Sequence, residues 1–190
     1  MKRRSIGVIF IIIGLAIVIS ASYMKYQAYS EQRKMKHNFE EGLLNLKDGI
    51  ETQGDKSNNE ESKFGTIAMI TIPKINLSVA VGEGTDSKLL KYAVGHFEGT
   101  ALPGEQGNFC VAGHRSYTYG EFFSRLEELN EGDEVEVKTS TGEYLYNVTE
   151  KFIVEPNEVW VLEPTNESVL TMVTCTKGGK KRVIIKGKLK

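Results

Sequence analysis

The chain has 190 residues, which is enough for one ordinary domain with additional segments but not for two full-sized domains. Charged residues make up 26% and hydrophobic residues 40%, a balance that excludes collagenous, coiled-coil and wholly disordered chains. The net charge of −1 argues against a nucleic-acid partner, because neutralising phosphates needs an excess of basic residues. Two cysteines, Cys110 and Cys175, are too few for a disulfide framework.

Residues 5–24 are uncharged and rich in Ile, Val, Leu, Phe and Ala, which predicts a transmembrane helix. At about 1.5 Å per residue this run spans the ~30 Å hydrocarbon core of a bilayer. Residues 1–4 carry the basic cluster Lys2-Arg3-Arg4, which should stay on the cytoplasmic side. The alternative is a cleaved signal peptide ending near Ile19-Ser20-Ala21-Ser22, although the run is longer than a usual signal sequence. We expect a retained single-pass signal anchor in the cell membrane, with the remainder of the chain extracytoplasmic.

Residues 25–63 are interpreted as an extracytoplasmic tether. A helix is predicted over Gln27–Leu46, with a short apolar stripe at Phe39, Leu43, Leu44 and Leu46. The following stretch Gly54–Ser62 has no apolar residue to offset its ordering entropy, so a flexible linker is expected there.

Residues 64–190 are expected to form the folded domain, and their pattern is mostly that of short strands. The predicted strands are Thr66–Ile72, Leu77–Val81, Phe109–Gly113, Glu134–Thr139, Tyr144–Val148, Phe152–Val154, Val159–Leu162, Val169–Thr174 and Val183–Lys188. Only Ser87–Tyr92 and Glu121–Leu129 have a helical pattern, and both are short. This spacing predicts an all-β domain with short helices, either a sandwich or a closed barrel, and we favour the closed barrel.

Cys175 stands at the end of the apolar run 170–174, and a new strand pattern begins at Arg182. Gly178-Gly179 marks a turn between the two strands. In a hairpin around residues 176–181, Cys175 and Arg182 are directly opposite and project from the same face. A nucleophilic cysteine needs a group that favours its thiolate and a donor where an oxyanion forms, and this register would place a guanidinium beside the thiol.

A second candidate segment is Asn108–Arg115, in which a predicted strand ends at Gly113 and His114 follows. Cysteine, histidine and arginine, each at the end of a strand, can meet at one rim of a barrel. Taken alone, a histidine beside a strand is more often an ordinary loop residue, so His114 by itself carries little functional information.

The two segments together resemble the sortase family, the membrane-anchored cysteine transpeptidases of Gram-positive cell surfaces. Residues 171–175, Thr-Met-Val-Thr-Cys, are similar to the family's T-L-x-T-C strand, with Met172 in place of Leu. Residues 95–108 and 112–115 resemble the run that leads to the family's catalytic histidine, and Ile72-Pro73-Lys74-Ile75 resembles its opening strand. The likeness spans about Thr66 to Gly187.

The resemblance implies an eight-stranded β-barrel that cleaves an LPxTG-like sorting signal after Thr through a thioester. It implies Cys175 as nucleophile, His114 as general acid/base and Arg182 as stabiliser of the substrate carbonyl and oxyanion. Thr174 is assigned to substrate binding. The implied partners are surface proteins with a C-terminal sorting signal, a cell-wall precursor amine and the membrane bilayer.

The class within the family is predicted from what the chain lacks and from its spacing. An Asp-Pro-aromatic lid motif, an apolar C-terminal tail and room for a long helix before the cysteine strand are all missing from the sequence. Class D is favoured and class A stays open. No cofactor is expected, with calcium left open because class A members sometimes bind it. The acidic group lacks the spacing of an EF-hand and is interpreted as a solvated face; it comprises Glu127, Glu128, Glu131, Asp133 and Glu134.

Two other functions remain open at this level, a thiol endopeptidase that only hydrolyses the signal and a non-catalytic barrel that binds cell-wall material. Cys110, between Phe109 and Val111, is predicted to be a buried, inert thiol. His96 is expected to be structural, and His37 lies on the tether and is given no function.

Overall fold

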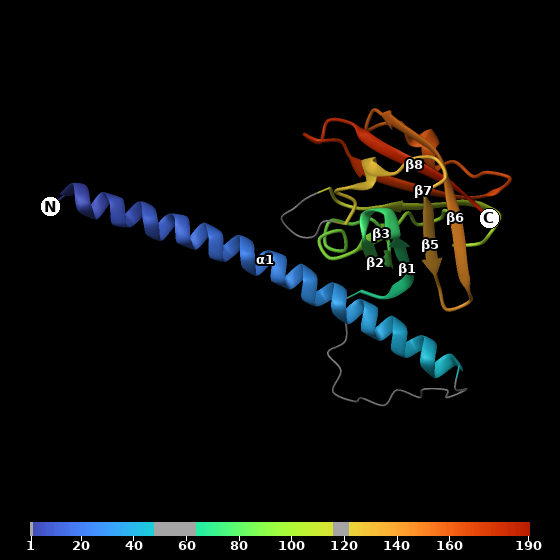
Figure 1. The fold of residues 1–190 in the computed structure, drawn as a ribbon, viewed down its shortest axis with the longest axis horizontal. Helices are drawn as coiled ribbons and strands as arrows, with labels where there is room; N and C mark the ends of the chain where they lie inside the picture. The colour runs from blue at the N-terminus through green and yellow to red at the C-terminus, as the bar shows by residue number, and fades with distance from the viewer. Residues whose placement is uncertain (1, 48–63, 116–121) are drawn as a thin grey trace.

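The computed structural model describes residues 2–47, 64–115 and 122–190, and it consists of one long helix attached to a barrel of strands (Figure 1). The helix is α1, Lys2–Lys47. The strands are β1 Thr66–Ile72, β2 Leu77–Glu83, β3 Val94–His96, β4 Gly107–Ala112, β5 Glu134–Lys138, β6 Glu143–Val154, β7 Ser168–Cys175 and β8 Arg182–Leu189. The short 3-10 helices are η1 Pro73–Ile75, η2 Leu126–Glu128 and η3 Val159–Leu162.

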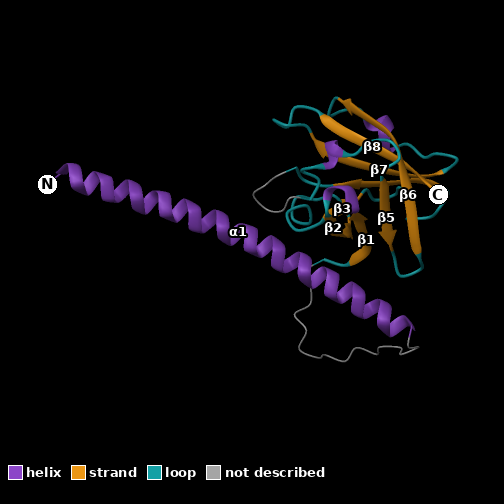
Figure 2. Cartoon of the chain, viewed as in Figure 1, coloured by secondary structure: helices purple, strands orange, loops and turns teal. Residues whose placement is uncertain are grey.

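The eight described strands close into a barrel in the order β1-β2-β3-β4-β7-β8-β6-β5, which confirms the predicted closed barrel. Figure 2 shows the strands curving around a common interior while the short helices lie in the connections. Two neighbouring pairs, β2–β3 and β4–β7, are parallel, and the others are antiparallel. The parallel β4–β7 pair is the one that matters for the site, because it joins segments about sixty residues apart in sequence.

Alternating hydrophobicity explains why these segments form strands. The five residues of β5 alternate exposed and buried, with Val135 and Val137 inside the barrel. One continuous core fills the barrel, and burying each large apolar side chain contributes roughly 1.5–3 kcal/mol. The core includes Ile70, Val81, Phe109, Val137, Tyr146, Leu170, Met172 and Ile185.

The structure corrects the predicted strand Val159–Leu162, which is the 3-10 helix η3. A four-residue apolar run is too short for its hydrophobic pattern to distinguish a strand from a short helix. The burial of its residues in the structure makes the distinction. Here Val161 alone is buried, whereas Val159 and Trp160 are 69% and 46% exposed. The barrel closes through the β6–β8 and β7–β8 pairs without this segment.

Other predicted elements differ in extent. The strands predicted at 144–148 and 152–154 are one strand, β6, with an irregularity of register between Val148 and Glu150. Strand β3 was not predicted, because three residues are too few to establish a period of two. The helix predicted at 87–92 is a series of turns stabilised at its start by Asp86, whose carboxylate accepts the N–H groups of Lys88 and Leu89. In the second predicted helix, Glu121 lies outside the described residues and only η2 is helical.

Helix α1 is continuous from the apolar segment into the region expected to be a tether, and its second half packs on the barrel. The buried side chains of this half are Ala28, Gln32, Met35 and Phe39, at helical spacing and no more than 9% exposed. Of the predicted stripe, Phe39 is buried, Leu44 is 60% exposed, and nothing is described for the side chain of Leu46. Residues 48–63, which include the predicted linker, lie outside the described residues.

Candidate active site

Cys175 and Arg182 form the last pair of the β7–β8 ladder, so the predicted hairpin register is confirmed. Paired residues of an antiparallel ladder project from one face of the sheet. The next residues inward, Thr174 and Val183, are buried, with Val183 in the core. Cys175 and Arg182 therefore project from the outer face, where both side chains are half-buried.

The turn between these strands is built from its own backbone and one hydroxyl. The N–H of Thr176 donates to the carbonyl of Lys181 at 2.9 Å, and Thr176 Oγ1 accepts the N–H of Lys181 at 3.1 Å. Gly178 and Gly179 have φ of 92° and 76°, a conformation that strains side chains with a Cβ. The Gly-Gly pair thus permits a short turn, which fixes Cys175 opposite Arg182.

His114 reaches the same end of the barrel through the parallel β4–β7 pair. The Cα partners of this pair run to Ala112 and Val173, and the N–H of Gly113 continues the ladder by donating to Val173 O at 3.1 Å. His114 follows Gly113 directly, and Cys175 follows Thr174, whose hydroxyl bonds the carbonyl of Gly113. The register thus brings together a histidine and a cysteine that are far apart in sequence.

Thr174 connects the two strand ends. Its hydroxyl donates to the carbonyl of Gly113 at 2.8 Å, and the residue is only 2% exposed. The side chain therefore fixes the residue before Cys175 to the residue before His114. Its assignment to substrate binding stays a prediction, and this buried geometry favours a positioning role instead.

Gly113 is required at its position by the close approach of an aromatic ring. A Cβ added there would lie 2.6 Å from the ring of Phe123, closer than real Cβ contacts. The backbone of Phe123 is also bonded to the site, since its N–H donates to His114 O at 3.1 Å. The segment that contains Phe123 thereby packs against the end of β4 that leads to His114.

Partial burial is the dominant electrostatic influence on His114. Because the charged imidazolium loses hydration there, burial lowers the pKa of His114 below its ordinary value. An imidazole with a lowered pKa is a weaker base and, when protonated, a stronger acid. Proton donation to a leaving amine is a reaction that such a group can perform.

Arg115 was not assigned a role from the sequence, yet its side chain contacts the backbone of Cys175. Its guanidinium forms a two-pronged ion pair with Glu127 and also donates from Nη1 to the carbonyl of Cys175 at 3.5 Å. Hydrogen bonding from Arg115 is the main cause that holds the pKa of Glu127 below its usual value. The only signal in the sequence was the position of Arg115 directly after His114.

The guanidinium of Arg182 is oriented by its own turn. Nη1 donates to the carbonyls of Gly179 at 3.2 Å and Lys181 at 3.3 Å. These two bonds use one nitrogen of the planar fork, so Nε and Nη2 keep N–H groups with no partner among the described residues. These donors are positioned on the face that carries Cys175.

The connection between β6 and β7 is held against the outside of the barrel by the buried Asn108. Its amide nitrogen donates to the carbonyls of Val161 and Glu163, both at 3.0 Å, and its amide oxygen accepts the hydroxyl of Thr171 at 2.7 Å. The indole of Trp160 stacks on Phe152 with ring centroids 5.6 Å apart. Trp160 and Phe152 therefore form a partly exposed aromatic surface on the outside of β6, the strand that pairs with β8.

Cys110 is fully buried, as predicted, and burial raises its pKa to about 12. A thiol with this pKa is protonated at neutral pH and is a poor nucleophile. Of the two cysteines, only Cys175 is partly exposed.

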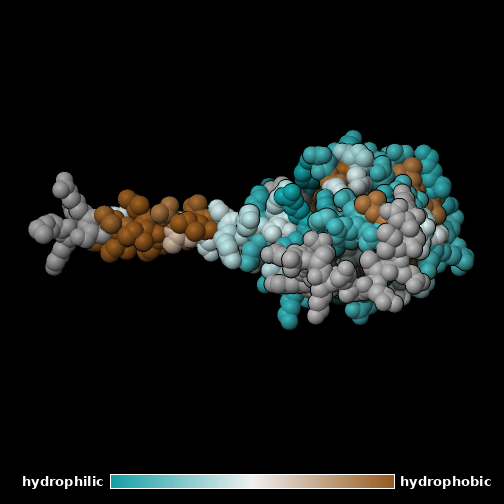
Figure 3. Space-filling model, turned by 90° about the horizontal axis from the view of Figure 1, so that it is seen from below, coloured by the Kyte–Doolittle hydropathy of each residue, from teal (hydrophilic) through white to brown (hydrophobic). Residues whose placement is uncertain are grey.

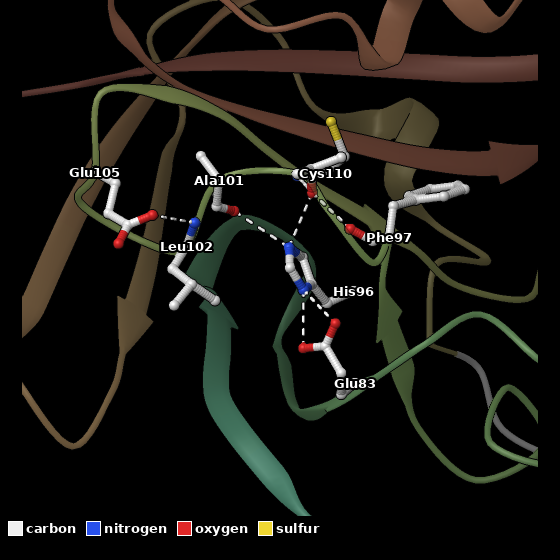
Figure 4. A network of polar contacts seen from close by, with 8 residues as sticks. Glu83, His96, Phe97, Ala101, Leu102, Glu105 and Cys110 are labelled. Carbon is white, nitrogen blue, oxygen red and sulfur yellow. Dashed lines mark hydrogen bonds and ion pairs between the residues drawn. The ribbon is translucent and has the colours of Figure 1, made fainter.

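His96 belongs to a separate buried network (Figure 4). Its Nδ1 is 3.0 Å from both carboxylate oxygens of Glu83, and its Nε2 is 2.9 Å from Thr100 Oγ1 and 3.2 Å from Ala101 O. The hydroxyl of Thr100 also accepts the N–H of Cys110 at 3.3 Å. These bonds connect β2, β3 and β4 and indicate a structural role for His96.

The remaining candidates are away from the cysteine or already paired. His37 is exposed on α1, 3.7 Å from Glu41. Among the acidic residues, four are paired with basic side chains: Glu127 with Arg115, Glu128 with Arg125, Asp133 with Lys74 and Glu134 with Lys190. Within the described ranges no cluster of three or more His, Cys, Asp or Glu could hold a metal ion.

The sequence of this chain is similar to those of known proteins. The family model described as the sortase domain matches residues 70–190. The chain is similar to Sortase D of Bacillus subtilis (strain 168), with 28% identity and 98% of each chain covered. It is also similar to Sortase A of Listeria monocytogenes, with 25% identity over 93% of this chain and 86% of the relative.

Solved structures with a similar fold and more than 30% identity include a Sortase D5 and a SrtA sortase. A Clostridium perfringens Sortase D5 transpeptidase has a TM-score of 0.66 and 33% identity, covering 88% of this chain and 99% of that one. The SrtA sortase from Actinomyces oris has a TM-score of 0.61 and 35% identity, covering 69% of this chain and 83% of that one.

Proposed function

The chain belongs to the sortase family of cysteine transpeptidases, and from this premise we propose that it cleaves an LPxTG-like sorting signal after Thr and transfers the cleaved surface protein to a cell-wall amine. The observation that carries this proposal is the register of three adjacent strands. It pairs Cys175 with Arg182, and the ladder that ends at Ala112 and Val173 supports the proximity of the following residues His114 and Cys175.

In the first half of the reaction the thiolate of Cys175 attacks the carbonyl carbon of the signal's Thr. The resulting oxyanion accepts hydrogen bonds from the free N–H groups of Arg182. His114, as imidazolium, gives its proton to the departing Gly amine as the C–N bond breaks. The product is a thioester between Cys175 and the cleaved protein.

In the second half the acceptor amine attacks the thioester carbonyl. His114, now neutral, takes the proton from the attacking nitrogen, and the thiolate of Cys175 leaves. Peptide bond cleavage and formation therefore balance without an external oxidant or energy source. Water in place of the amine would give hydrolysis, which is the thiol endopeptidase alternative.

The substrate surface is proposed to extend toward the end of β6. Val154, the last residue of β6, pairs with Arg182, and Ile153 and Trp160 nearby are 58% and 46% exposed. An exposed apolar surface of this kind suits the Leu and Pro of the signal, because contact removes apolar area from water. Replacement of Trp160 by Ala should raise KM for the peptide more than it lowers kcat.

The protein acts at the membrane in this proposal, with residues 1–4 cytoplasmic and the barrel outside. In support, α1 is long and apolar enough to cross a bilayer, and the side chains from Ile6 to Ile19 are exposed around it. Protease added to intact protoplasts should digest the barrel; full protection would overturn this orientation.

Class D is the proposed class. The supporting comparison is the likeness to Sortase D of Bacillus subtilis over 98% of both chains, together with the Sortase D5 structure of which 99% is covered. A relative called Sortase A is also similar, at 25% identity. The class is tested by asking which residue in the variable position of the signal gives the highest kcat/KM.

The central experiment incubates the full-length protein with a fluorescent LPxTG peptide, with and without an amine acceptor. We expect a covalent adduct on Cys175 by mass spectrometry and an amine-linked product whose yield rises with acceptor concentration. Cys175→Ala should give neither. Hydrolysed peptide as the sole product at every acceptor concentration would establish the endopeptidase alternative. Absence of any adduct on Cys175 would overturn the proposal.

A further inference from the structure

Helix α1 is fixed to the barrel by buried polar contacts. The side-chain amide of Gln32 accepts the N–H of Ala80 on β2 at 3.0 Å and donates to the carbonyl of Tyr92. The backbone of Met35 and the amine of Lys36 make further bonds, to Thr66 and Ser78. Because Gln32 is only 8% exposed, its two bonds are largely shielded from water and fix this turn of α1 to the barrel.

The joint begins close to the end of the apolar segment. Gln32 is eight residues beyond Met24, which is about 12 Å along a helix, and Ala28 is already buried against the barrel. In Figure 3 the apolar half of α1 projects alone, and the polar barrel begins where that half ends. A bilayer around residues 5–24 would therefore meet the barrel directly.

The strand register determines which end of the barrel faces that bilayer. The turn between β5 and β6 lies against Glu40, Leu43 and Leu44, near the end of α1 that is far from the apolar segment. Strand β6 begins at that turn and ends at Val154, the partner of Arg182. The Cys175–Arg182 end is thus opposite to the β5–β6 turn, and Figure 1 shows the β7–β8 turn on the side of the N-terminus of α1.

The β7–β8 turn has the charge expected of a surface that contacts anionic lipid. Lys177, Lys180 and Lys181 are all exposed. Lys181 is paired with Glu155 at 2.7 Å, and Lys177 lies within electrostatic range of Glu127. Lys180 is the exposed cation of the turn for which the described residues provide no acidic partner.

We propose that the catalytic end of the barrel rests on the bilayer, with the lysines of the β7–β8 turn contacting anionic phospholipid headgroups. The inference rests on the membrane anchoring in the proposed function and adds an orientation and a lipid contact to it. Cys175 then works at the headgroup level, where a membrane-bound substrate emerges. An anionic lipid surface attracts lysine side chains that lie within about one Debye length of it.

The test uses the full-length Cys175→Ala protein in vesicles of phosphatidylcholine with about one third phosphatidylglycerol. Cys110 is buried and does not react, so a fluorophore can be attached at Lys177→Cys or, as the matched control, at Ser140→Cys in the β5–β6 turn. Spin-labelled headgroups quench a fluorophore only at short range. We expect quenching at position 177 and little at position 140.

The same assay tests the contribution of the lysine charges and of the Gln32 contacts between α1 and the barrel. Removing phosphatidylglycerol, or introducing Lys180→Gln, should weaken headgroup binding by about five-fold per lysine. Lys138→Gln, at the far turn, should change nothing. Gln32→Ala should reduce the difference in quenching between positions 177 and 140, because α1 then holds the barrel less firmly in one orientation.

The outcomes separate the inference from the proposed function. Protein that fails to float with vesicles overturns the anchoring itself. Floated protein with equal quenching at both positions overturns the orientation, while thioester formation by the parent protein still tests catalysis. Quenching at position 177 that is independent of anionic lipid and of Lys180 overturns the headgroup contact.

Discussion

Cys175 and Arg182 are directly opposed across the β7–β8 ladder, separated in sequence by a single turn. Their side chains project from the same face of the sheet. The hairpin alone therefore makes the thiol and the guanidinium neighbours, independently of the other strands. Lys181, one residue earlier, instead directs its amine to Glu155. The β7–β8 turn therefore carries several positive charges, but among them Arg182 is the one paired with Cys175.

Arg182→Ala should lower kcat by roughly a hundred- to a thousand-fold, the usual cost of losing a positioned oxyanion donor. Arg182→Lys should recover only part of this loss, because lysine keeps the charge but not the planar fork of donors. Single-turnover acylation of the full-length enzyme measures the effect.

The matched controls are Lys180→Ala and Lys181→Ala, which keep Arg182 and should leave kcat nearly unchanged. A loss in either variant as large as that of Arg182→Ala would contradict the role assigned to the register.

The two cysteines should differ completely in function. Cys175→Ala should abolish the thioester, whereas Cys110→Ala should retain activity and destabilise the fold by about 1 kcal/mol, since it removes a buried group. Iodoacetamide should modify the native protein at Cys175 alone, because the pKa of Cys110 is raised to about 12. Modification of native Cys110 at neutral pH would show that its burial is wrong.

Thr174→Val should reduce kcat while leaving the shape of the side chain nearly unchanged. The substitution removes the hydroxyl that bonds Gly113 and leaves a buried carbonyl without its donor, at a cost of about 1–3 kcal/mol in unfolding free energy. Thr174→Ser keeps the hydroxyl and should restore most of kcat. If Thr174→Val instead changes KM alone, the residue contacts substrate as the sequence analysis assigned.

The pH profile should reflect the burial of His114. Burial lowers its pKa in the folded protein below the value of about 6.5 in an unfolded chain. The ionisation of His114 in the free enzyme therefore falls below that value, and the acid limb of kcat/KM that reports it should have its midpoint there. A midpoint above about 6.5 would contradict this.

The same shift has a consequence for stability. The unfolded chain binds the proton more tightly than the folded chain, so the unfolding free energy should fall as the pH decreases from about 6.5 through the folded pKa. His114→Gln should remove this part of the pH dependence in urea denaturation, whereas a substitution at exposed His37 should not.

Local patterns in the sequence determined much of this protein. Twenty uncharged residues predict a membrane-spanning helix, and the alternation in Thr66–Ile72 and in Glu134–Lys138 predicts strands that the structure contains. The opposition of Cys175 and Arg182 was also predictable, because a short glycine turn fixes the register of the strands that it connects. Each of these features depends on residues close together in the chain.

Tertiary structure decided what depends on distant segments. The ends of the strands that precede His114 and Cys175 lie side by side because β4 pairs with β7, and no local pattern specifies that register. The apolar run 159–162 is a 3-10 helix because the barrel closes without it, and the second half of α1 is docked because Gln32 finds backbone partners on β2 and before β3. Periodicity reports only which face of a segment is buried; which partner buries it is determined by packing across the whole chain.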